Sequence, residues 1–499
     1  MTNLASASEL AAAHRRRQLP EGNQRRVQDV RIHDGSLVWT RVDDGRQDRV
    51  RVDDVLFTLD LSNSKPGQFG FIICCLAQDL EQQTQPFQLH LLAADAVPDQ
   101  LLQEYRINDI PLHLRNGDGN EVDVVVSTKS GVGHALVFWQ SVLQPLWSLA
   151  EEALGTQLQA SKVVVTQDSQ SVRQFARALQ PDQAQAFSEA PSSRTIILLS
   201  GDGGVVDLLN GREASSGAPA PLLALFPLGT GNALFHSLHK PLESVPGPSP
   251  LVLALRTLFL GVPADLPVFR AAFSPGSRIV SFVESSGQAS GADANTHLAR
   301  QDAAVSSLYG AIVASYGFHA SIVYESDTPE HRVHGAKRFG MVAQELLRES
   351  HPYRAKLQVR RPSSSSPEPD PRETHAYVLV TMVSNLERTF AISPASRPLD
   401  NKLRLVHFGP VGGERTMDVM VKAYDGGKHV GMRWDDGEEV RYEEVEEVTV
   451  ETLEDDARWR KFCVDGTIVE VPKGGSMSVG KAQKGLFRVL VDSRVQLDG

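Results

Sequence analysis

The residues best suited to chemistry in this chain lie in a short glycine-rich stretch, Ser200-Gly201-Asp202-Gly203-Gly204. Because glycine has no side chain, the backbone of such a stretch can approach a ligand closely and point its N–H groups at an anion, of which phosphate is the natural example. A bare carboxylate would repel phosphate, so Asp202 fits this setting only with a metal ion or a proton-transfer role. Magnesium–nucleotide chemistry supplies both. The alternative is an ordinary strand-to-helix turn.

Two further stretches of the same kind are Ser127–Gly133 and Pro227–Asn232. In the second of them, Thr230 and Asn232 are placed either to cap a helix or to hydrogen-bond a phosphate. The chain has no Gly-Lys-Ser/Thr sequence and so no Walker A loop, and none of the three stretches has the spacing of a dinucleotide fingerprint. Three loops suited to anions in one region favour a shared binding site over coincidence.

Alternating strands and helices must position these loops. Short apolar runs predict buried strands at 122–126, 163–166 and 196–199, and periodic patterns predict helices at 134–149 and 169–179. Such alternation indicates a parallel sheet with crossover helices. Because ligands bind at the carboxyl ends of parallel strands, the glycine loops are expected to meet at one edge of this sheet.

Length and composition limit the class of protein. The 499 residues suffice for about three domains. A net charge of −11 and a pI near 5.8 argue against nucleic acid as the main partner. The three cysteines, Cys74, Cys75 and Cys463, offer neither a disulfide framework nor a metal cage, which indicates a reducing compartment.

The N-terminal residues 1–26 lack the apolar segment of a signal peptide and are predicted to form a disordered tail. No stretch reaches the ~18 consecutive apolar residues that a membrane span needs. The protein is therefore expected to be cytoplasmic, either soluble or peripherally associated with a membrane.

Changes of pattern along the chain predict three domains. Residues 27–118 are expected to form a small, mostly β module, which is either a docking domain for a membrane or partner or a barrel or sandwich that only packs on its neighbour. Residues 119–262 form the α/β lobe. In 263–499 helical patterns thin out, and strands are predicted at 279–283, 356–359, 377–383, 403–408, 440–452 and 486–491. Two inserts are predicted within this part: a polar, glycine-rich loop at 286–304 and a disordered Ser/Pro segment at 362–374.

Taken together, these stretches resemble the diacylglycerol kinase catalytic superfamily, and most of all its sphingosine and long-chain-base kinase branch. The three loops are similar to the family's Asn-Pro-x-Ser-Gly, Gly/Ser-Gly-Asp-Gly and Pro-x-Gly-Thr/Ser-Gly-Asn motifs. Farther on, Ser315–Asp327 resembles the Trp-Gly-Phe…Glu-Ser-Glu stretch of sphingosine kinases, and Arg332–Phe339 the basic segment after it. Tyr377–Val380, Phe390–Pro394 and Phe462–Gly466 resemble the C-terminal strands and the Val-Asp-Gly-Glu turn. The likeness extends from about Val122 to Val491.

The resemblance implies an α/β nucleotide-binding lobe like that of NAD kinases and diacylglycerol kinases, followed by an antiparallel β-sandwich lobe that binds lipid, with the N-terminal β module as an addition. It also implies ATP and Mg²⁺ as cofactors. The ATP-binding residues implied are Ser127, Lys129, Ser130, Gly131, Thr166, Ser200, Gly201, Gly203, Gly204, Gly229, Thr230, Gly231, Asn232, Arg332, Arg338 and Gly466. Arginines suit this role because they fork onto phosphate oxygens, although both could equally be solvated charges on a surface helix.

Asp202 is the first candidate for the general base on a lipid hydroxyl, since phosphoryl transfer needs mainly positioning and charge stabilisation. Asp465 is the second candidate, either as base or as magnesium ligand, and its alternative is a plain Asp-Gly hairpin turn. Ser321, Val323 and Glu325 are expected to contact the lipid. Ser321 and Val323 replace acidic residues of sphingosine kinases, Ser127 replaces an asparagine and Thr467 replaces a glutamate.

The predicted activity is ATP-dependent phosphorylation of a hydroxyl of a sphingoid long-chain base, with peripheral membrane contact. Ceramide and diacylglycerol are alternative acceptors, favoured by the missing acidic pair. An NAD kinase would share the Gly-Asp-Gly loop, but the C-terminal motifs point to the lipid branch. A catalytically inactive lipid- or nucleotide-binding protein is the alternative of another class, suggested by Ser127 and Thr467.

Overall fold

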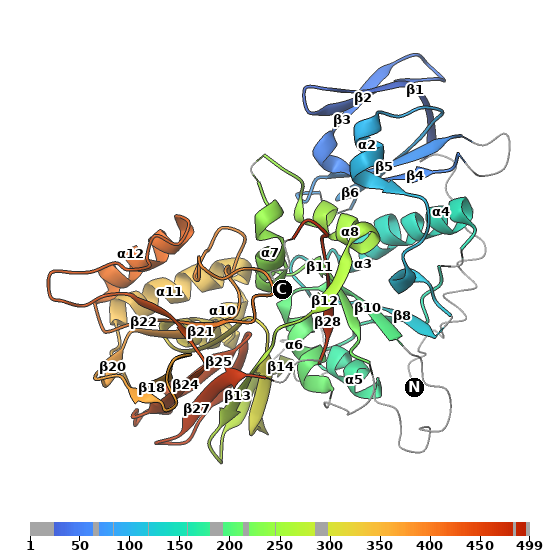
Figure 1. Cartoon of the computed structure of the whole chain (residues 1–499). Helices are drawn as coiled ribbons and strands as arrows, with labels where there is room; N and C mark the ends of the chain where they lie inside the picture. Colours follow the sequence, from blue (N-terminus) through green and yellow to red (C-terminus); the bar gives the residue numbers. More distant parts are fainter. Residues whose placement is uncertain are drawn as a thin grey trace, which may run out of the picture. The chain divides into compact units, whose positions relative to one another are not determined.

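A computed structural model describes residues 24–62, 69–82, 84–117, 119–156, 158–179, 193–212, 219–244, 246–284, 298–482 and 486–495. Contacts divide them into two units (Figure 1). The first contains the described residues up to Thr230 together with His239–Asp265 and 486–495, and the second contains Gly231–Leu238 and the described residues from Leu266 to Ala482. Most of the predicted tail, 1–23, lies outside the described residues, whereas 24–26 begin the first strand.

The N-terminal module is a β-sheet, as the strand-rich pattern predicts, with one α-helix before its last strand. Its strand order is β3-β2-β1-β6-β5-β4-β7. The 3-10 turn Val52–Asp54 (η1) separates its third strand from its fourth. The elements are β1 (Gln24–His33), β2 (Ser36–Arg41), β3 (Gln47–Arg51), β4 (Val55–Asp60), β5 (Phe71–Gln78), β6 (Phe87–Ala94), α2 (Asp99–Tyr105) and β7 (Arg106–Ile107).

The α/β lobe follows in the same unit, with strand order β12-β28-β11-β10-β8-β9. Neighbouring strands from β28 to β9 are parallel, and β12 is antiparallel to β28. The strands are β8 (Asn120–Val126), β9 (Lys162–Val165), β10 (Ser193–Ser200), β11 (Leu222–Pro227), β12 (Val262–Asp265) and β28 (Arg488–Val491). Residues 122–126 and 195–200 are buried, because helices cover both faces of the sheet.

The crossover helices lie where the sequence predicts them. The long helix predicted at 134–149 is continuous in direction but contains one π-helical turn, η3 (Trp139–Leu143), between α3 (Ala135–Phe138) and α4 (Gln144–Leu154). Figure 1 shows α5 and α6 on one side of the sheet and α3, α4 and α8 on the other. These remaining helices are α5 (Ser171–Ala178), α6 (Asp202–Gly211), α7 (Ala233–His239) and α8 (Pro250–Leu260).

The second unit is a sandwich of two antiparallel sheets, as predicted. The first has the order β16-β13-β27-β24-β18-β19, with β20 also paired to β18. Its strand β18 alternates buried and exposed residues, because one face packs inward and the other meets solvent. Its strands are β13 (Phe269–Phe273), β16 (Ser307–Gly310), β18 (Tyr353–Arg360), β19 (Glu368–Pro369), β20 (Thr374–His375), β24 (Glu447–Thr452) and β27 (Ser476–Lys481).

The other sheet has the order β15-β14-β26-β25-β17-β21-β22-β23. The buried Tyr316 of β17 reaches across to β24, where its hydroxyl lies 3.1 Å from Thr452 Oγ1, so the inner faces of the two sheets meet there. The strands are β14 (Arg278–Glu284), β15 (Leu298–Ala304), β17 (Val313–Gly317), β21 (Tyr377–Thr381), β22 (Leu403–Phe408), β23 (Arg441–Val445), β25 (Lys461–Val464) and β26 (Thr467–Glu470).

Helices also occur in the second unit after Leu266, where the sequence indicated a surface helix only as an alternative for Arg332 and Arg338. They are α9 (Phe318–Ser326), α10 (Pro329–Arg332), α11 (Arg338–Glu349) and α12 (Gly413–Tyr424). The predicted strand 440–452 is also two strands that belong to different sheets, β23 and β24. Among the described helices, none combines the length and apolar character needed to cross a bilayer.

Three predictions about the C-terminal part are wrong. Segment 362–374 is not disordered: Asp370 within it has a side chain only 5% exposed, donates its N–H to Leu357 O, and pairs with Arg441 at 2.8 Å. In the predicted loop 286–304, residues 298–304 form β15 against β14, while 286–297 lie outside the described residues. The predicted strand 486–491 does not join the antiparallel lobe, because β28 pairs in parallel with β11 in the α/β sheet.

Candidate active site

The first loop, Ser127–Gly133, leaves the carboxyl end of β8 and is held by the neighbouring strands. Ser127 N–H donates to Leu199 O of β10 at 3.0 Å. Thr128 bonds twice to the buried Thr166, its N–H donating to Thr166 Oγ1 at 3.0 Å and its hydroxyl to Thr166 O at 2.9 Å. Thr166, which the resemblance implies as an ATP contact, directly follows β9. Through these two hydrogen bonds it holds the first loop in place. Lys129 within the loop is exposed.

The second loop, at the end of β10, joins the first directly. Gly201 N–H donates to Ser130 Oγ at 2.8 Å. Gly201 is the N-cap of α6, which begins at Asp202, so this carboxylate lies in the first helical turn and is partly exposed. The N-terminus of a helix favours an anionic ligand, because its first N–H groups have no partners within the helix.

The third loop, Pro227–Asn232, follows β11 and packs on the other two. Leu228 N–H donates to Ser200 O at 3.1 Å. A Cβ added at Gly201 would lie 2.8 Å from Gly229 Cα, and one added at Gly131 would lie 2.5 Å from Leu228 O. Gly131 also has a φ of +55°, so any other residue would be strained there. The structure therefore brings the three predicted loops into contact at one edge of the sheet.

The glycines of these loops serve two purposes. Those at 131, 201 and 204 let protein segments approach each other; at Gly204 an added Cβ would lie 2.6 Å from Ser200 Oγ. Gly203 is different, because it is exposed and an added Cβ there meets no atom within 4 Å. The backbone around Gly203 thus leaves room for a bound group beside the start of α6. Asn232, at the end of the third loop, has a φ of +53° and precedes α7.

The predicted phosphate-binding arginines lie in the second unit and share one partner. Arg332, at the end of α10, forks onto Asp327 with Nε–Oδ1 and Nη2–Oδ2 distances of 2.9 and 2.7 Å. Arg338, the first residue of α11, has its Nη2 3.9 Å from Asp327 Oδ1. The sequence analysis assigns no role to Asp327, although this residue ends the stretch Ser315–Asp327 that resembles sphingosine kinases. A phosphate would have to compete with this carboxylate for Arg332.

Asp465 and Gly466 form the turn between β25 and β26. Their φ values of +46° and +87° are those of a two-residue hairpin turn, the alternative considered for this Asp-Gly pair. The Asp465 side chain also accepts bonds from the backbone N–H groups of Ala311 (2.7 Å), Ile312 (3.1 Å) and Val313 (2.6 Å). Asp465 thereby anchors the segment before β17, and its role as base or metal ligand stays a prediction.

Of the three predicted lipid contacts on α9, Ser321 and Glu325 are four residues apart and share one face, whereas Val323 lies on the other. Ser321 is buried and accepts a hydrogen bond from the Tyr353 hydroxyl at 2.9 Å. Val323 packs with the side chains of Ala320 and Cys463 against the sheet. Glu325 is held by Arg458, with Nε–Oε1 and Nη2–Oε2 distances of 2.7 and 3.2 Å. The pairing of Glu325 with Arg458 joins residues 133 positions apart, so no local pattern could have indicated it.

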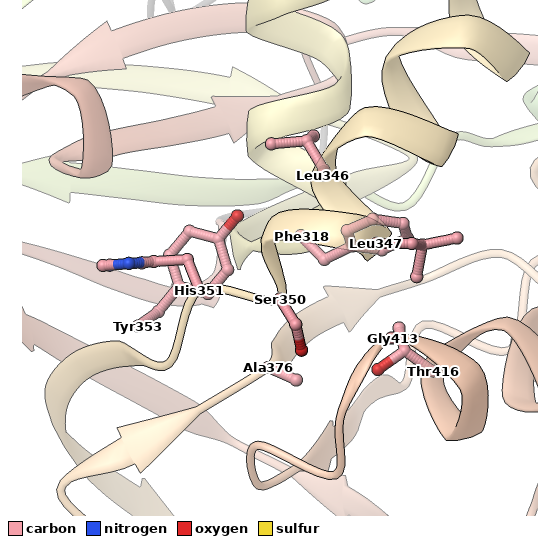
Figure 2. Close-up of a pocket in the computed structure, with 9 residues that line it drawn as sticks. All are labelled: Phe318, Leu346, Leu347, Ser350, His351, Tyr353, Ala376, Gly413 and Thr416. Atoms are coloured by element: carbon pink, nitrogen blue, oxygen red, sulfur yellow. The ribbon is translucent and has the colours of Figure 1, made fainter.

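A pocket in the second unit lies beside this helix (Figure 2). Figure 2 shows His351 and Tyr353 on one side of it and Gly413 and Thr416, at the start of α12, on the other. Its volume of about 20 Å³ holds about one water molecule, so it does not accommodate an acyl chain in this conformation. The other lining residues are Phe318, Leu346, Leu347, Ser350 and Ala376.

No group of three or more His, Cys, Asp or Glu side chains among the described residues is arranged to hold a metal ion. A magnesium ion bound with a nucleotide takes only one or two carboxylates from the protein and uses phosphate oxygens and water for the rest. Asp202, in the first turn of α6 next to the exposed Gly203, is suited to that role.

Comparison with known proteins identifies the segment that contains the three loops. Residues 122–258 match the family model of the diacylglycerol kinase catalytic domain. Among curated protein sequences, none matches this chain significantly.

Among solved structures, a diacylglycerol kinase from Bacillus anthracis str. Sterne aligns with 75% of this chain and 98% of its own, at 14% identity and a TM-score of 0.43. Two further structures from the same organism cover the same shares at 14 and 15% identity, with TM-scores of 0.46 and 0.44. These scores are too low to support an argument, so the assignment rests on the family model and the loops it spans. Residues 122–258 therefore resemble a diacylglycerol kinase catalytic domain, and by this match the protein is a lipid kinase.

Proposed function

We propose that this protein transfers the γ-phosphate of ATP to a hydroxyl group of a membrane lipid. The observation that carries the proposal is the contact of three glycine loops at the carboxyl ends of parallel strands, with the N-terminus of α6 among them. Backbone N–H groups in such an arrangement suit the phosphates of a nucleotide. The residues proposed to hold ATP in the first unit and the segment after it are Ser127, Lys129, Ser130, Gly131, Thr166, Ser200, Gly201, Gly203, Gly204, Gly229, Thr230, Gly231 and Asn232.

Asp202 is the proposed general base. Its carboxylate begins the helix whose N-terminus is proposed to face the phosphates, and it is partly exposed. A proton-accepting carboxylate near the acceptor hydroxyl suffices, because the hydroxyl proton is lost late in a loose phosphoryl transfer. Asp465 is the weaker candidate, since its oxygens already accept three backbone N–H groups. A Mg²⁺ ion bound with ATP would neutralise phosphate charge.

Arg332, Arg338 and Gly466 complete the proposed nucleotide contacts by resemblance. The two arginines would stabilise charge on the transferred phosphoryl group. Asp327 now holds Arg332 in a two-bond pair. If a phosphate took the place of the Asp327 carboxylate, the Arg332 guanidinium would still have an anionic partner.

For the acceptor, the resemblance of Ser315–Asp327 to sphingosine kinases supports a sphingoid long-chain base, with Ser321, Val323 and Glu325 near it. One observation favours the second candidate, a neutral acceptor such as ceramide or diacylglycerol. The acidic side chains of this stretch, Glu325 and Asp327, are each paired with an arginine, Arg458 and Arg332 respectively. A lipid amine would have to displace an arginine to gain a carboxylate partner, whereas a neutral headgroup would not.

The test is a lipid phosphorylation assay with labelled ATP and magnesium. Sphinganine, phytosphingosine, ceramide and diacylglycerol are offered in mixed micelles to the full chain, to Asp202→Asn and to Asp207→Asn. Asp207 is the matched control, because it lies in the same helix but is paired with Arg173 at 3.4 Å. We expect label in at least one lipid, a loss of at least a hundredfold in Asp202→Asn, and activity within threefold of the native chain in Asp207→Asn. ATP binding without label in any lipid would instead indicate the inactive alternative.

Peripheral membrane contact is part of the proposal, because the acceptor resides in a bilayer. Helix α12 supports it: Met417, Val421 and Tyr424 are 40, 57 and 50% exposed and spaced to share one face. The charges of the helix cancel, with Glu414 and Asp418 against Arg415 and Lys422, so a zwitterionic surface suits it. We expect Val421→Asp to lower flotation with phosphatidylcholine vesicles, while Leu112→Asp, at another exposed apolar site, leaves flotation unchanged. Equal flotation of both variants would rule out α12 as the contact.

A further inference from the structure

A buried arginine lies in the middle of an apolar helix and has no part in the proposed chemistry. Arg256 is 3% exposed within α8, whose other residues from Leu251 to Phe259 are buried as well. An arginine almost never occupies such a position unless its charge and donors are satisfied. Burial lowers the pKa of the Arg256 guanidinium, but arginine keeps its charge in proteins.

The hydrogen-bond partners of Arg256 all belong to the N-terminal module. Its Nε donates to Val55 O at 2.8 Å, and its Nη2 donates to Val52 O at 3.2 Å and to Asp53 O at 3.0 Å. The guanidinium also lies 4.4 Å from the centre of the Tyr105 ring, a cation–π distance. These carbonyls surround the short turn η1, so Arg256 caps the C-terminal end of that turn from the neighbouring lobe.

Further contacts extend the same interface along α8. Phe57 of β4 packs on Phe259 with ring centres 4.5 Å apart. His113 Nε2 lies 2.8 Å from Leu258 O, and Arg51 donates to Gly247 O at 2.5 Å just before the helix. The module therefore contacts the chain just before α8 and again over residues 256–259 of the helix, where Arg256 makes three of the hydrogen bonds.

The elements that the module holds are those that carry the glycine loops. Helix α8 packs on β11, the strand that ends in the third loop. On a second path, Phe87 of β6 packs edge-on against His134 and Phe138 at 5.9 and 5.1 Å. His134 directly follows the first loop, and Phe138 in turn contacts Phe226 of β11 at 5.4 Å.

We propose that the N-terminal module is a positioning element of the nucleotide site, and that Arg256 and Phe87 are the residues through which it sets the first and third loops. The proposal rests on the proposed function for the identity of the ligand, ATP. The contacts that connect the module to the loops do not depend on that identity. Arg256 is a positioning residue, since it acts through α8 and β11. A module that only packs on the lobe would stabilise the protein without changing the loops.

The test compares full-length Arg256→Met and Arg256→Lys with Arg177→Met, which replaces an exposed arginine of α5. Methionine keeps the apolar stem and removes the donors, and lysine restores the charge without the fork. We expect a rise of about tenfold in the KM for ATP for Arg256→Met, with the lipid KM and kcat within twofold. Arg256→Lys should lie in between, and Arg177→Met should match the native chain.

Hydrogen exchange in the same variants separates positioning from general loosening. Faster exchange in Arg256→Met is expected at 52–58, 127–134 and 226–231, with α5 unchanged as the internal reference. Faster exchange confined to the module and α8, with an unchanged KM for ATP, would overturn the proposal. A uniform rise across the unit would overturn it equally.

Phe87→Leu gives a second, milder variant in case Arg256→Met does not fold. It keeps most of the apolar volume and removes the edge-on ring contacts, so exchange should rise at 127–138. Unchanged exchange at 127–138 would contradict the second path. If the native chain fails to bind ATP, the proposed function fails, while the exchange results still decide whether the module sets the loops.

Discussion

The hydroxyl of Ser130 accepts a hydrogen bond of 2.8 Å from the backbone N–H of Gly201, so one side chain of the first loop fixes the start of the second. Gly201 is also the N-cap residue of the helix that carries Asp202. The position of the proposed base therefore depends on a residue 71 positions earlier in the chain. The bond gives Ser130 a structural task besides its proposed contact with ATP.

Ser130→Ala removes this bond and should weaken ATP binding. A single neutral hydrogen bond contributes about 1 kcal/mol net, which corresponds to about a fivefold loss of affinity. Ser130→Thr keeps the hydroxyl and should bind within twofold of the native chain. Calorimetric titration with MgATP measures both, and equal affinities for the alanine and threonine variants would contradict the proposed link.

Gly203→Asp should abolish ATP binding and leave the fold intact. A Cβ at this position meets no atom within 4 Å outside the adjoining backbone, so folding should tolerate a side chain there, whereas a carboxylate beside the helix N-terminus would repel phosphate. The measurements are the unfolding temperature and the affinity for MgATP. Native affinity in this variant would count against the nucleotide site.

Gly201→Ala is the comparison variant, and here we expect the fold rather than the phosphate contact to be disturbed. Its Cβ would lie 2.8 Å from Gly229 Cα, so the second and third loops must separate. We expect this variant to lose about 2 kcal/mol of stability, as is usual for overpacking, and to unfold at a lower temperature than Gly203→Asp.

Asp465→Asn tests whether this carboxylate anchors a loop or holds a metal. An amide cannot accept all three backbone N–H groups, so we expect a loss of about 2 kcal/mol in the free energy of unfolding in urea. The magnesium dependence of ATP binding should stay unchanged. A tenfold shift in that dependence at native stability would support the metal role instead.

Acid should destabilise the second unit through Glu470. Burial raises the pKa of this carboxyl, but Lys461, Arg300 and Arg278 outweigh burial and lower it to about 2 from an ordinary 4.5. A folded-state pKa below the unfolded one means that the native state binds fewer protons. The resulting stability, of the order of 3 kcal/mol, is complete above pH 4.5 and is lost as the pH falls toward 2.

Glu470→Gln should remove that acid dependence and lower stability at neutral pH by about 3 kcal/mol. The reason is that Lys461, 2% exposed and 2.8 Å from Glu470 Oε2, would keep a buried charge without its carboxylate. Urea unfolding between pH 3 and pH 7 measures both effects. An unchanged slope with pH in the variant would show that other carboxylates cause it.

The nucleotide lobe could be predicted from the sequence because its signals are local. Buried parallel strands appear as continuous apolar runs, and each is followed directly by its glycine loop. The contact among the loops follows from the parallel arrangement alone. What the pattern could not show is which glycine approaches protein and which faces open space, since that depends on atoms from a different loop, as at Gly201 and Gly229.

The second unit was harder to predict because its determinants are distant in sequence. Helix α9 is largely apolar and has no clear helical alternation in its sequence, and in the structure Ala320 within it packs on Cys463 and Ile468. Segment 362–374 has the composition of a disordered linker, yet Arg441 and Leu357 bind Asp370 within it. The partner of Glu325 likewise lies far along the chain, at Arg458.

Strand β28 makes the α/β sheet depend on residues 488–491, which the ribosome adds more than 200 residues after β11, the strand that β28 joins. While the antiparallel sandwich is being synthesised, the position between β11 and β12 in the α/β sheet is therefore unfilled, and both strands lack one hydrogen-bonding neighbour. The α/β sheet therefore cannot be completed until the second unit has been synthesised, because only β28 fills the position between β11 and β12.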